Sequence, residues 1–355
     1  MAGDPEILLE RRGAAGLVVL NRPEALNAIT HGMVLALGRA LDGWAADAAV
    51  TRVVVTAAGE KAFSAGGDIR HLYDLGMAGH HEEALRFWRD EYPLNVRIKR
   101  YPKPYVSLID GIVMGGGVGV SLHGSHRVAG ERYQFAMPEV GIGFFPDVGA
   151  THALPRLPGR TGTYLALTGE RVRAADALAL GLATHAAPSA AFAGIREALV
   201  AGEPVDEVLA RFARDPGPPP LMAERETIDR CFAAPSVPGI LEKLDKVAVQ
   251  GSAFARKTAE IIRRKSPTSL AVALEQMRRG GALDFAEAMR TEFRIVSRIV
   301  RGRDFYEGVR AAIIDKDGAP RWHPATLAEV DDRVVAGHFA DLGPAELELP
   351  DGPLP

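Results

Sequence analysis

The chain has 355 residues, of which 47% are hydrophobic and 25% are charged, and its formal net charge at pH 7 is −3. This length favours one large domain, or a core with a smaller appendage. The balanced charge gives no basic field for nucleic acid, and the single cysteine, Cys231, excludes a disulfide framework and a multi-cysteine zinc site. We therefore expect a small-molecule task or a protein partner.

The start of the chain and its most apolar stretch bear on where the protein works. Residues 1–6 are acidic and lack both the apolar core of a signal peptide and the Arg-rich composition of a transit peptide. Residues 106–122 are interrupted by Asp110 and by five glycines, which does not fit a membrane-spanning helix. We expect a cytoplasmic protein without a membrane span.

The first half of the chain repeats one local pattern. Residues 6–21 and 51–57 are β-branched and apolar, which predicts strands. Between them, residues 25–47 place apolar side chains every three or four positions, which predicts an amphipathic helix. A further strand is predicted at 105–110, and it runs into the glycine run at 115–117. The recurring unit is therefore strand, glycine turn and helix.

The second half has a different character. From about residue 160 the pattern is mostly helical, with a Pro-rich break at 215–220. We place a soft domain boundary within 190–220, which divides a core at 1–200 that carries the site from a helical region at 201–340. The last fifteen residues, 341–355, hold four prolines and predict a loosely attached, flexible tail.

Several common chemistries lack their motifs. The chain has no Gly-x-Ser-x-Gly, no Gly-Lys dipeptide and no His-Glu-x-x-His, and its glycine run does not have the spacing of a dinucleotide fingerprint. Serine hydrolases, P-loop NTPases, zincins and Rossmann dehydrogenases therefore lose their main support. The sequence His-His-Glu-Glu at 80–83 predicts a solvated helix surface rather than a metal site, because adjacent histidines on a helix point to different faces.

Two glycine-rich turns are candidates for binding an oxygen atom. Small residues follow a predicted strand at 63–69, and the run at 114–117 lets a ligand approach the main chain. If the two turns face each other, their N–H groups form an oxyanion hole. Taken alone, each is better explained by an ordinary tight turn.

A third segment, 135–149, places Glu139 and Asp147 eight residues apart across glycines and prolines. Carboxyl groups beside apolar residues such as Phe144 and Phe145 are expected to have raised pKa values, which suits proton transfer near neutrality. The alternative is that Glu139 caps a helix and Asp147 stabilises a turn.

Together the three segments resemble the crotonase (enoyl-CoA hydratase/isomerase) superfamily and, within it, the 3-hydroxyisobutyryl-CoA hydrolases. The resemblance covers residues 6 to about 335 and is carried by these motifs: Ala-Gly-Gly-Asp-Ile-Arg at 65–70, Glu91-Tyr92, Lys103-Pro104-Tyr105, Met-Gly-Gly-Gly-Val-Gly at 114–119, Met-Pro-Glu-x-Gly-Ile-Gly-x-Phe-Pro-Asp-Val-Gly ending at Gly149, and Gly-x-Asp-Phe-x-Glu-Gly-Val-Arg-Ala-x-x-Ile-Asp-Lys-Asp at 302–317. It implies an α/β fold, a crotonase-type spiral of repeated β-β-α units followed by a mostly helical C-terminal region.

The resemblance also implies roles for single residues. Gly67 and Gly116 would donate N–H groups to a thioester carbonyl oxygen, and Ala65 would line the same turn beside the substrate. Glu139 would activate water or attack C1 itself, and Asp147 would order the water or relay a proton to the leaving thiolate. Glu91 would bind the 3-hydroxyl group of the substrate. Arg70 and Lys316 would face the CoA phosphates, although either is also explained as a solvated surface charge.

One departure from the wider superfamily bears on the reaction. Hydratases typically carry a second catalytic glutamate where this chain has Gly119, and aspartate at position 147 is typical of the hydrolases. The resemblance therefore implies hydrolysis of a short 3-hydroxyacyl-CoA, as in valine degradation, with no cofactor besides the CoA of the substrate. The alternatives are a hydratase or isomerase that uses Glu139 alone, and a non-catalytic acyl-CoA-binding or RNA-binding member. A homo-oligomer, trimer or hexamer, is common in the superfamily.

Overall fold

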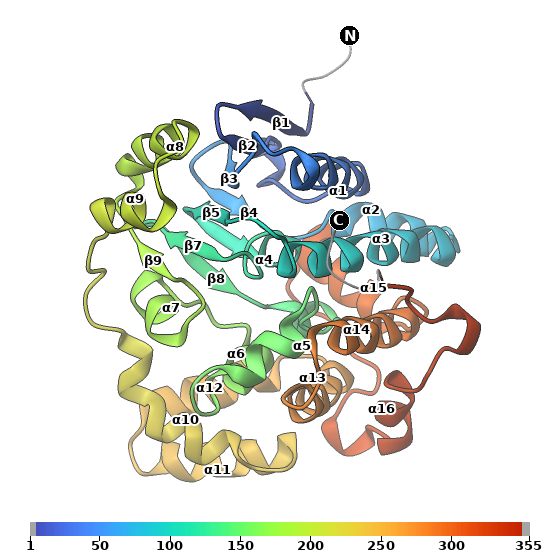
Figure 1. The fold of residues 1–355 in the computed structure, drawn as a ribbon. Helices are drawn as coiled ribbons and strands as arrows, with labels where there is room; N and C mark the ends of the chain where they lie inside the picture. The colour runs from blue at the N-terminus through green and yellow to red at the C-terminus, as the bar shows by residue number, and fades with distance from the viewer. Residues whose placement is uncertain (1–4, 350–355) are drawn as a thin grey trace.

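A computed structural model describes residues 5–349 of the chain. Its strands form a six-stranded sheet in the order β1-β2-β3-β5-β7-β9 and a three-stranded sheet in the order β4-β6-β8 (Figure 1). Neighbouring strands are parallel except for the antiparallel pair β1 and β2. The strands are β1 (Ile7–Arg12), β2 (Ala15–Leu20), β3 (Arg52–Ala57), β4 (Ala62–Ser64), β5 (Tyr105–Ile109), β6 (Ile112–Met114), β7 (His126–Ala129), β8 (Gln134–Ala136) and β9 (His185–Ala186).

The chain alternates between the two sheets. The strand β3 of the large sheet is followed by β4 of the small one, and the same step recurs from β5 to β6 and from β7 to β8. Each pair is followed by helical structure, so the predicted spiral of β-β-α units is confirmed. The predicted strands at 6–21, 51–57 and 105–110 correspond to β1 with β2, to β3 and to β5.

The small sheet positions the three candidate segments. In its register Ser64 lies opposite Val113, and Met114 lies opposite Ala136. Because the three strands are parallel, the residues that follow them leave the sheet at the same edge. The two glycine turns and the segment that carries Glu139 are therefore brought together by the sheet itself.

The first helix begins later than its apolar pattern predicts. The helix α1 spans His31–Ala46, and the Thr30 side chain caps it by accepting a hydrogen bond from the Met33 N–H. The residues before it form a short 3₁₀ turn, η1 (Pro23–Ala25), and Leu26 and Asn27 take positive φ values that no α-helix allows. The prediction of a helix over 25–47 was therefore wrong for its first six residues.

The remaining helices fall into a part that covers the sheets and a larger C-terminal part. They are α2 (Ile69–Met77), α3 (His81–Lys99), α4 (Gly116–Gly119), α5 (Ala150–Ala153), α6 (Thr161–Thr168), α7 (Ala174–Leu180), α8 (Phe192–Val200), α9 (Val205–Phe212), α10 (Arg225–Phe232), α11 (Val237–Val249), α12 (Ala253–Arg263), α13 (Pro267–Gly280), α14 (Phe285–Ile299), α15 (Asp304–Val309) and α16 (Asp332–His338). None of the helices within residues 5–349 is long and apolar enough to cross a membrane.

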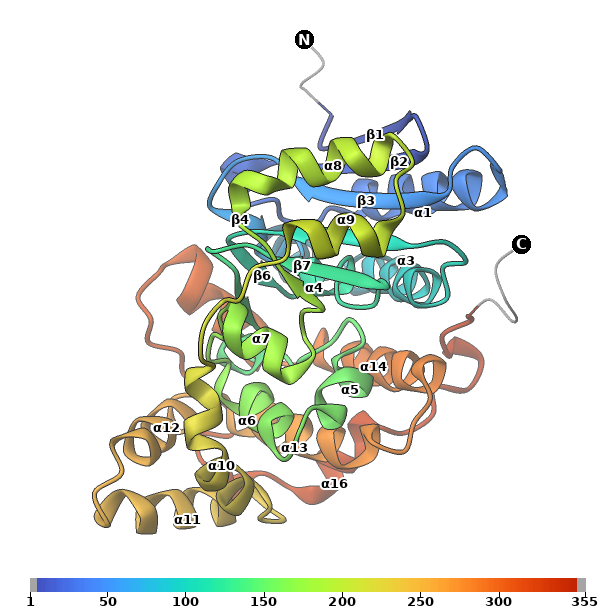
Figure 2. The same ribbon diagram turned by 60° about the vertical axis from the view of Figure 1, so that its left-hand side comes forward.

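The helices α8 and α9 pack on the large sheet, and α9 lies beyond the predicted core boundary at residue 200. Ile195, Leu199 and Val208 of α8 and α9 belong to one buried cluster with Val54 and Val106 of the strands. Figure 2 shows both helices lying over one face of that sheet. The stretch 213–219, which has neither helix nor strand, then leads to α10. We therefore propose a division near residue 213, inside the range of 190–220 expected from the sequence.

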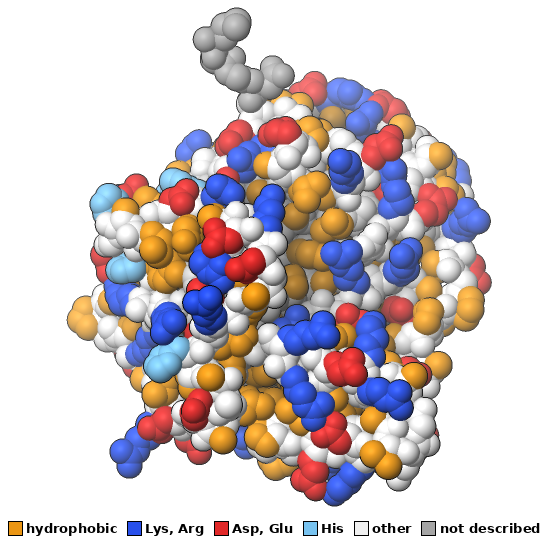
Figure 3. All heavy atoms as spheres, turned by 180° about the vertical axis from the view of Figure 1, so that it is seen from behind, with side chains coloured by type: hydrophobic (Ala, Val, Ile, Leu, Met, Phe, Trp, Pro, Cys, Tyr) orange, Lys and Arg blue, Asp and Glu red, His pale blue; other side chains and the backbone are white. Residues whose placement is uncertain are grey.

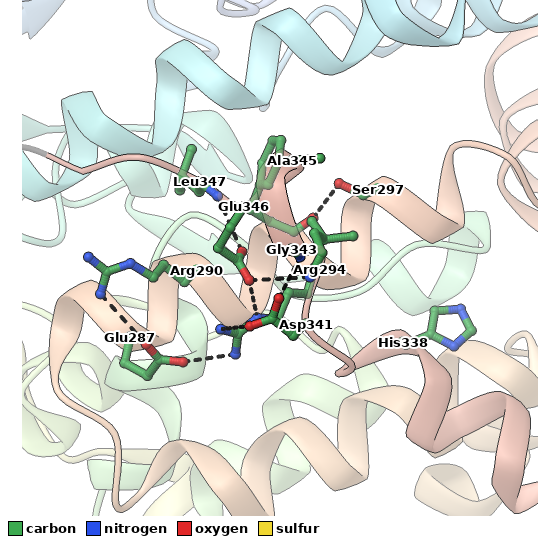
Figure 4. Close-up of polar contacts among 12 residues, drawn as sticks. Glu287, Arg290, Arg294, Ser297, His338, Asp341, Gly343, Ala345, Glu346 and Leu347 are labelled. Atoms are coloured by element: carbon green, nitrogen blue, oxygen red, sulfur yellow. Dashed lines mark hydrogen bonds and ion pairs between the residues drawn. The ribbon is translucent and has the colours of Figure 1, made fainter.

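The segment expected to be a loose tail lies partly outside the described residues, at 350–355. Of the rest, Leu347 is only 2% exposed and joins the main hydrophobic core. Arg294 of α14 forms ion pairs with Glu346 at 2.8 Å and with Glu287 at 2.8 Å (Figure 4). Arg89 of α3 donates a hydrogen bond to the Ala345 carbonyl. Residues 341–347 are therefore fixed against α14 and α3.

Candidate active site

A cavity of about 700 Å³ opens at the edge where the three strands of the small sheet end. Its walls come from the two glycine turns, from α3 and from the segment after β8, with Ile313 and Lys316 of the C-terminal region. The eight residues singled out from the sequence all line it: Ala65, Gly67, Arg70, Glu91, Gly116, Glu139, Asp147 and Lys316. The structure thus brings them together, while their roles stay predictions.

The two glycine turns lie directly against each other in the wall of the cavity. A Cβ atom placed on Gly116 would lie 3.3 Å from the Gly67 nitrogen and 2.9 Å from the Glu91 Oε1 atom. Gly116 is the first residue of α4, so its N–H has no partner inside the helix. Gly115 before it takes a φ of +44°, a conformation that L side chains rarely adopt. The two turns therefore lie close to each other in the cavity wall.

Glu139 begins the 3₁₀ turn η2 (Glu139–Ile142), three residues after β8 ends. Its side chain is buried, and its Oε2 atom has no hydrogen-bond partner among residues 5–349. Burial first, and then the nearby charge of Asp147, raise the pKa of Glu139 well above its ordinary value. A buried carboxyl group with an unused oxygen atom is suited to exchange a proton with a ligand or water.

Asp147 lies between η2 and α5, in the Asp147 loop, defined here as residues 144–151. Its Oδ2 atom accepts a hydrogen bond of 3.0 Å from the Tyr92 hydroxyl, and the Trp88 side chain also donates to it. Burial raises the pKa of Asp147 to about 7, although both donors favour the ionised form and lower the pKa. The group therefore titrates close to neutrality.

The helix α3 contributes a face that the sequence revealed only in part. Glu91 and Tyr92 lie three and four residues after Trp88, so both lie beside Trp88 on one face of the helix. Glu91 is 1% exposed, and its Oε1 atom has no partner among the described residues. Burial and the charges of Asp147 and Glu292 raise its pKa well above the ordinary value. The spacing around Glu91 was the signal that could have identified Trp88 and Tyr92.

A carboxyl group that the sequence analysis missed is Glu292 of α14. It is fully buried, and it accepts hydrogen bonds from the N–H groups of Gly149 and Thr151. Burial and the charge of Asp147 raise its pKa to about 8, whereas the two N–H donors lower it. Nothing in the sequence near residue 292 indicates this contact.

The two cations that the sequence pointed to lie at the rim of the cavity. Arg70 is exposed on α2 and donates a long hydrogen bond to the Ile313 carbonyl, and Lys316 is exposed three residues after Ile313. A third rim cation, Arg22, is held by ion pairs with Glu6 and Asp68. On the face drawn in Figure 3, Lys and Arg side chains lie among Asp and Glu side chains around a central hollow with hydrophobic walls. The charges are mixed, as the composition predicts.

Gly119 lies behind the cavity wall. A Cβ atom at this position would lie 2.8 Å from the Asn95 Nδ2 atom and 3.0 Å from the Val148 Cβ atom. Both neighbours are buried, so neither can move aside without disturbing α3 or the Asp147 loop. The place where hydratases carry their second glutamate therefore has no room for a side chain.

A Gly119→Glu variant is expected to be less stable by at least about 1–3 kcal/mol, because a longer side chain overfills a packed site and buries a further carboxyl group. Urea unfolding followed by circular dichroism measures this. The matched control is Gly43→Glu, since Gly43 lies exposed in α1 with nothing within 4 Å of a Cβ atom. Equal stability of the two variants would contradict the packing argument.

A family model and named relatives place the chain in the same protein family. A sequence model described as enoyl-CoA hydratase/isomerase matches residues 15–339. The mitochondrial 3-hydroxyisobutyryl-CoA hydrolase of Danio rerio is 44% identical over 97% of this chain and 92% of its own length. The Homo sapiens protein of the same name is 41% identical over 97% of this chain and 91% of its own.

Solved structures carry other names. A structure titled as a carnitinyl-CoA dehydratase from Mycobacterium thermoresistibile is 42% identical, with a TM-score of 0.93 over 98% of this chain and 100% of that one. A structure titled as an enoyl-CoA hydratase from Rhodobacter sphaeroides is 41% identical, with a TM-score of 0.91 over 97% of this chain and 100% of that one. The fold is thus shared almost completely.

Proposed function

The chain belongs to the enoyl-CoA hydratase/isomerase family, and from this premise we propose that it hydrolyses short 3-hydroxyacyl-CoA thioesters, with 3-hydroxyisobutyryl-CoA as the favoured substrate. The observation that carries the proposal is the cavity, in which two buried carboxyl groups, Glu139 and Asp147, lie with the Gly67 and Gly116 turns. The full-length similarity to the named hydrolases supports the choice of substrate.

The two glycine turns stabilise the reacting oxygen. The thioester carbonyl oxygen accepts hydrogen bonds from the Gly67 and Gly116 N–H groups, which strengthen as negative charge develops on it during attack at C1. One donor of this kind contributes on the order of two to three powers of ten in rate. Because the donors belong to the main chain, no side chain has to reorganise during the reaction.

Glu139 carries the attack. It either takes a proton from the water that adds to C1, or it adds to C1 itself and forms a mixed anhydride that water then opens. In both routes the C1–S bond breaks, one water molecule is consumed, and the products are the free hydroxyacid and the CoA thiol. The unpartnered Oε2 atom of Glu139, which lines the cavity, supports this role.

Asp147 and Glu91 complete the site. Asp147, whose pKa is about 7, orders the water or passes a proton to the leaving thiolate. Glu91 binds the 3-hydroxyl group, because its Oε1 atom is buried beside Gly116 without a partner and a substrate hydroxyl would satisfy it. Arg70 and Lys316 line the same cavity, and under this proposal they face the CoA moiety.

The second candidate function is hydration of an unsaturated acyl-CoA, and the titles of the two similar solved structures favour it. Glu139 alone would then supply the acid and base chemistry. The packing around Gly119 argues against this function, because the second glutamate of a hydratase cannot be placed there.

The two functions are separated by one pair of assays on the same protein. Release of free thiol from 3-hydroxyisobutyryl-CoA is measured beside the loss of enoyl absorbance of crotonyl-CoA. Thiol release without loss of enoyl absorbance is the expected result. Loss of enoyl absorbance without thiol release would reject the hydrolase and leave the hydratase.

Three further features belong to the proposal. The reaction needs no cofactor besides the CoA of its substrate, and it places the protein in valine degradation. The proposed location is the cytoplasm, whereas the names of the relatives place those proteins in mitochondria. It assembles as a homo-oligomer, a trimer or hexamer, as is common in the family.

A further inference from the structure

The backbone of the Asp147 loop takes φ values that are unfavourable for most residues. Val148, next to Asp147, has a φ of +52°, which is a rare and strained value for a β-branched residue. Gly149 follows with a φ of +91°. A strained segment of this kind persists only when the surrounding structure fixes it.

Three buried side chains from outside the loop fix it. Glu292 of α14 accepts hydrogen bonds of 2.8 Å from the Gly149 N–H and 2.9 Å from the Thr151 N–H. Gln276 of α13 donates to the Pro146 carbonyl at 2.5 Å and to the Thr151 hydroxyl at 2.6 Å. The His123 ring donates to the Val148 carbonyl at 2.6 Å; burial lowers the pKa of His123 to about 3, so the ring is neutral.

Glu292 is the least replaceable of the three. Both of its oxygen atoms are used, and each accepts from a main-chain N–H that would otherwise be buried without a partner. A glutamine would keep the size but would turn an NH₂ group towards one of the two N–H donors. The loop would then lose one hydrogen bond and gain a repulsive contact beside Asp147.

The helix that carries Glu292 is itself held in place. Phe293 packs edge to face against Tyr92 of α3, whose hydroxyl donates to Asp147. The next residue, Arg294, pairs with Glu287 and Glu346 (Figure 4). The helix α14 therefore connects to Asp147 twice, through Tyr92 and through the loop backbone.

We propose that Glu292 is a positioning residue for the hydrolysis, which sets the place of the Asp147 carboxyl group through the Gly149 and Thr151 N–H groups. The proposal rests on the proposed function for the reaction that it serves. It assigns a role in the reaction to the C-terminal helical region, beyond covering the cavity. Gln276 acts on the same loop through the Pro146 carbonyl and the Thr151 hydroxyl.

The test is a Glu292→Gln variant assayed for thiol release well below its melting temperature. We expect kcat to fall about tenfold to a hundredfold while KM changes by less than about twofold, because a shifted Asp147 harms the reaction more than it harms binding. Amide hydrogen exchange at Gly149 and Thr151 should become faster in the same variant. The kcat is calculated on the concentration of folded protein, measured by circular dichroism, because an unfolded fraction would lower the apparent kcat without changing KM.

Two further variants sharpen the test. Ser297→Ala is the matched control, since Ser297 is buried on the same helix and its hydroxyl donates only within that helix, to the Phe293 carbonyl. It should keep wild-type kcat and exchange. Gln276→Leu should lower kcat as Glu292→Gln does, and the double variant should lose less than the product of the two losses, because both residues act through one loop.

Wild-type kcat in Glu292→Gln would overturn the proposal, whether or not amide exchange changes. Failure of the proposed function is recognised separately: the wild-type protein would then release no thiol. In that case unchanged exchange at Gly149 and Thr151 in the variant overturns the positioning role as well, and faster exchange supports it for whichever reaction the cavity performs.

Discussion

A Glu139→Gln variant should hydrolyse 3-hydroxyisobutyryl-CoA at least about a hundredfold more slowly than the wild-type protein while it binds CoA equally well. Glutamine keeps the size of the side chain, so the cavity and its glycine turns stay intact. It cannot accept a proton or form an anhydride, which removes both routes open to Glu139. The change therefore falls on kcat rather than on binding.

The measurement is thiol release under saturating substrate, with CoA affinity determined by calorimetry. Glu24→Gln is the matched control, because Glu24 lines the rim of the same cavity but is exposed in η1. It should leave turnover within about twofold. Turnover of Glu139→Gln within tenfold of the wild type would mean that the catalytic carboxyl group is another residue.

An Asp147→Asn variant should also lose at least about a hundredfold in turnover, for a different reason. Asparagine can still accept the hydrogen bond from Tyr92, so the loop should stay in place, but it has no carboxyl proton to relay. Thiol release measures the loss. Asp90→Asn on the exposed side of α3 is the control, and unchanged turnover of Asp147→Asn would contradict the assignment.

The same variant has a signature in stability. Burial raises the pKa of Asp147 to about 7 in the folded protein, so the folded state holds this proton more tightly than the unfolded chain does. The wild-type protein should therefore lose stability as pH rises from about 4 to about 7, and Asp147→Asn should not lose this part. Urea unfolding at pH 5 and pH 8 compares the two. From pH 5 to pH 8, the unfolding free energy of the wild type should fall relative to that of Asp147→Asn. An unchanged difference between the two proteins would contradict the burial argument.

The sequence predicted those parts of the site that follow directly on strands. The Gly67 turn follows β4, the Gly116 turn follows β6, and Glu139 follows β8, so local patterns were enough to find them. Their meeting was an expectation from resemblance, and the parallel small sheet gives the physical reason for it. Glu91 was found only through its motif, because a helix pattern does not show which face meets a cavity.

The parts that were missed have no local signal. Glu292 and Gln276 contact the Asp147 loop from 143 and 130 residues away in the chain, and each lies in an ordinary amphipathic helix. The late start of α1 was missed because Leu26 continues the apolar spacing although its φ is positive. The packing of residues 341–347 was missed because prolines suggested a loose end, whereas Leu347 finds a place in the core.

The reach of α13 and α14 back to the Asp147 loop also bears on how the protein is made. During synthesis, the two glycine turns, Glu139 and Asp147 all leave the ribosome long before residues 276 and 292 exist. Contacts between such distant parts of a chain form late in folding. A nascent chain that already contains every group proposed for the chemistry therefore has no fixed Asp147 loop until its last quarter is translated.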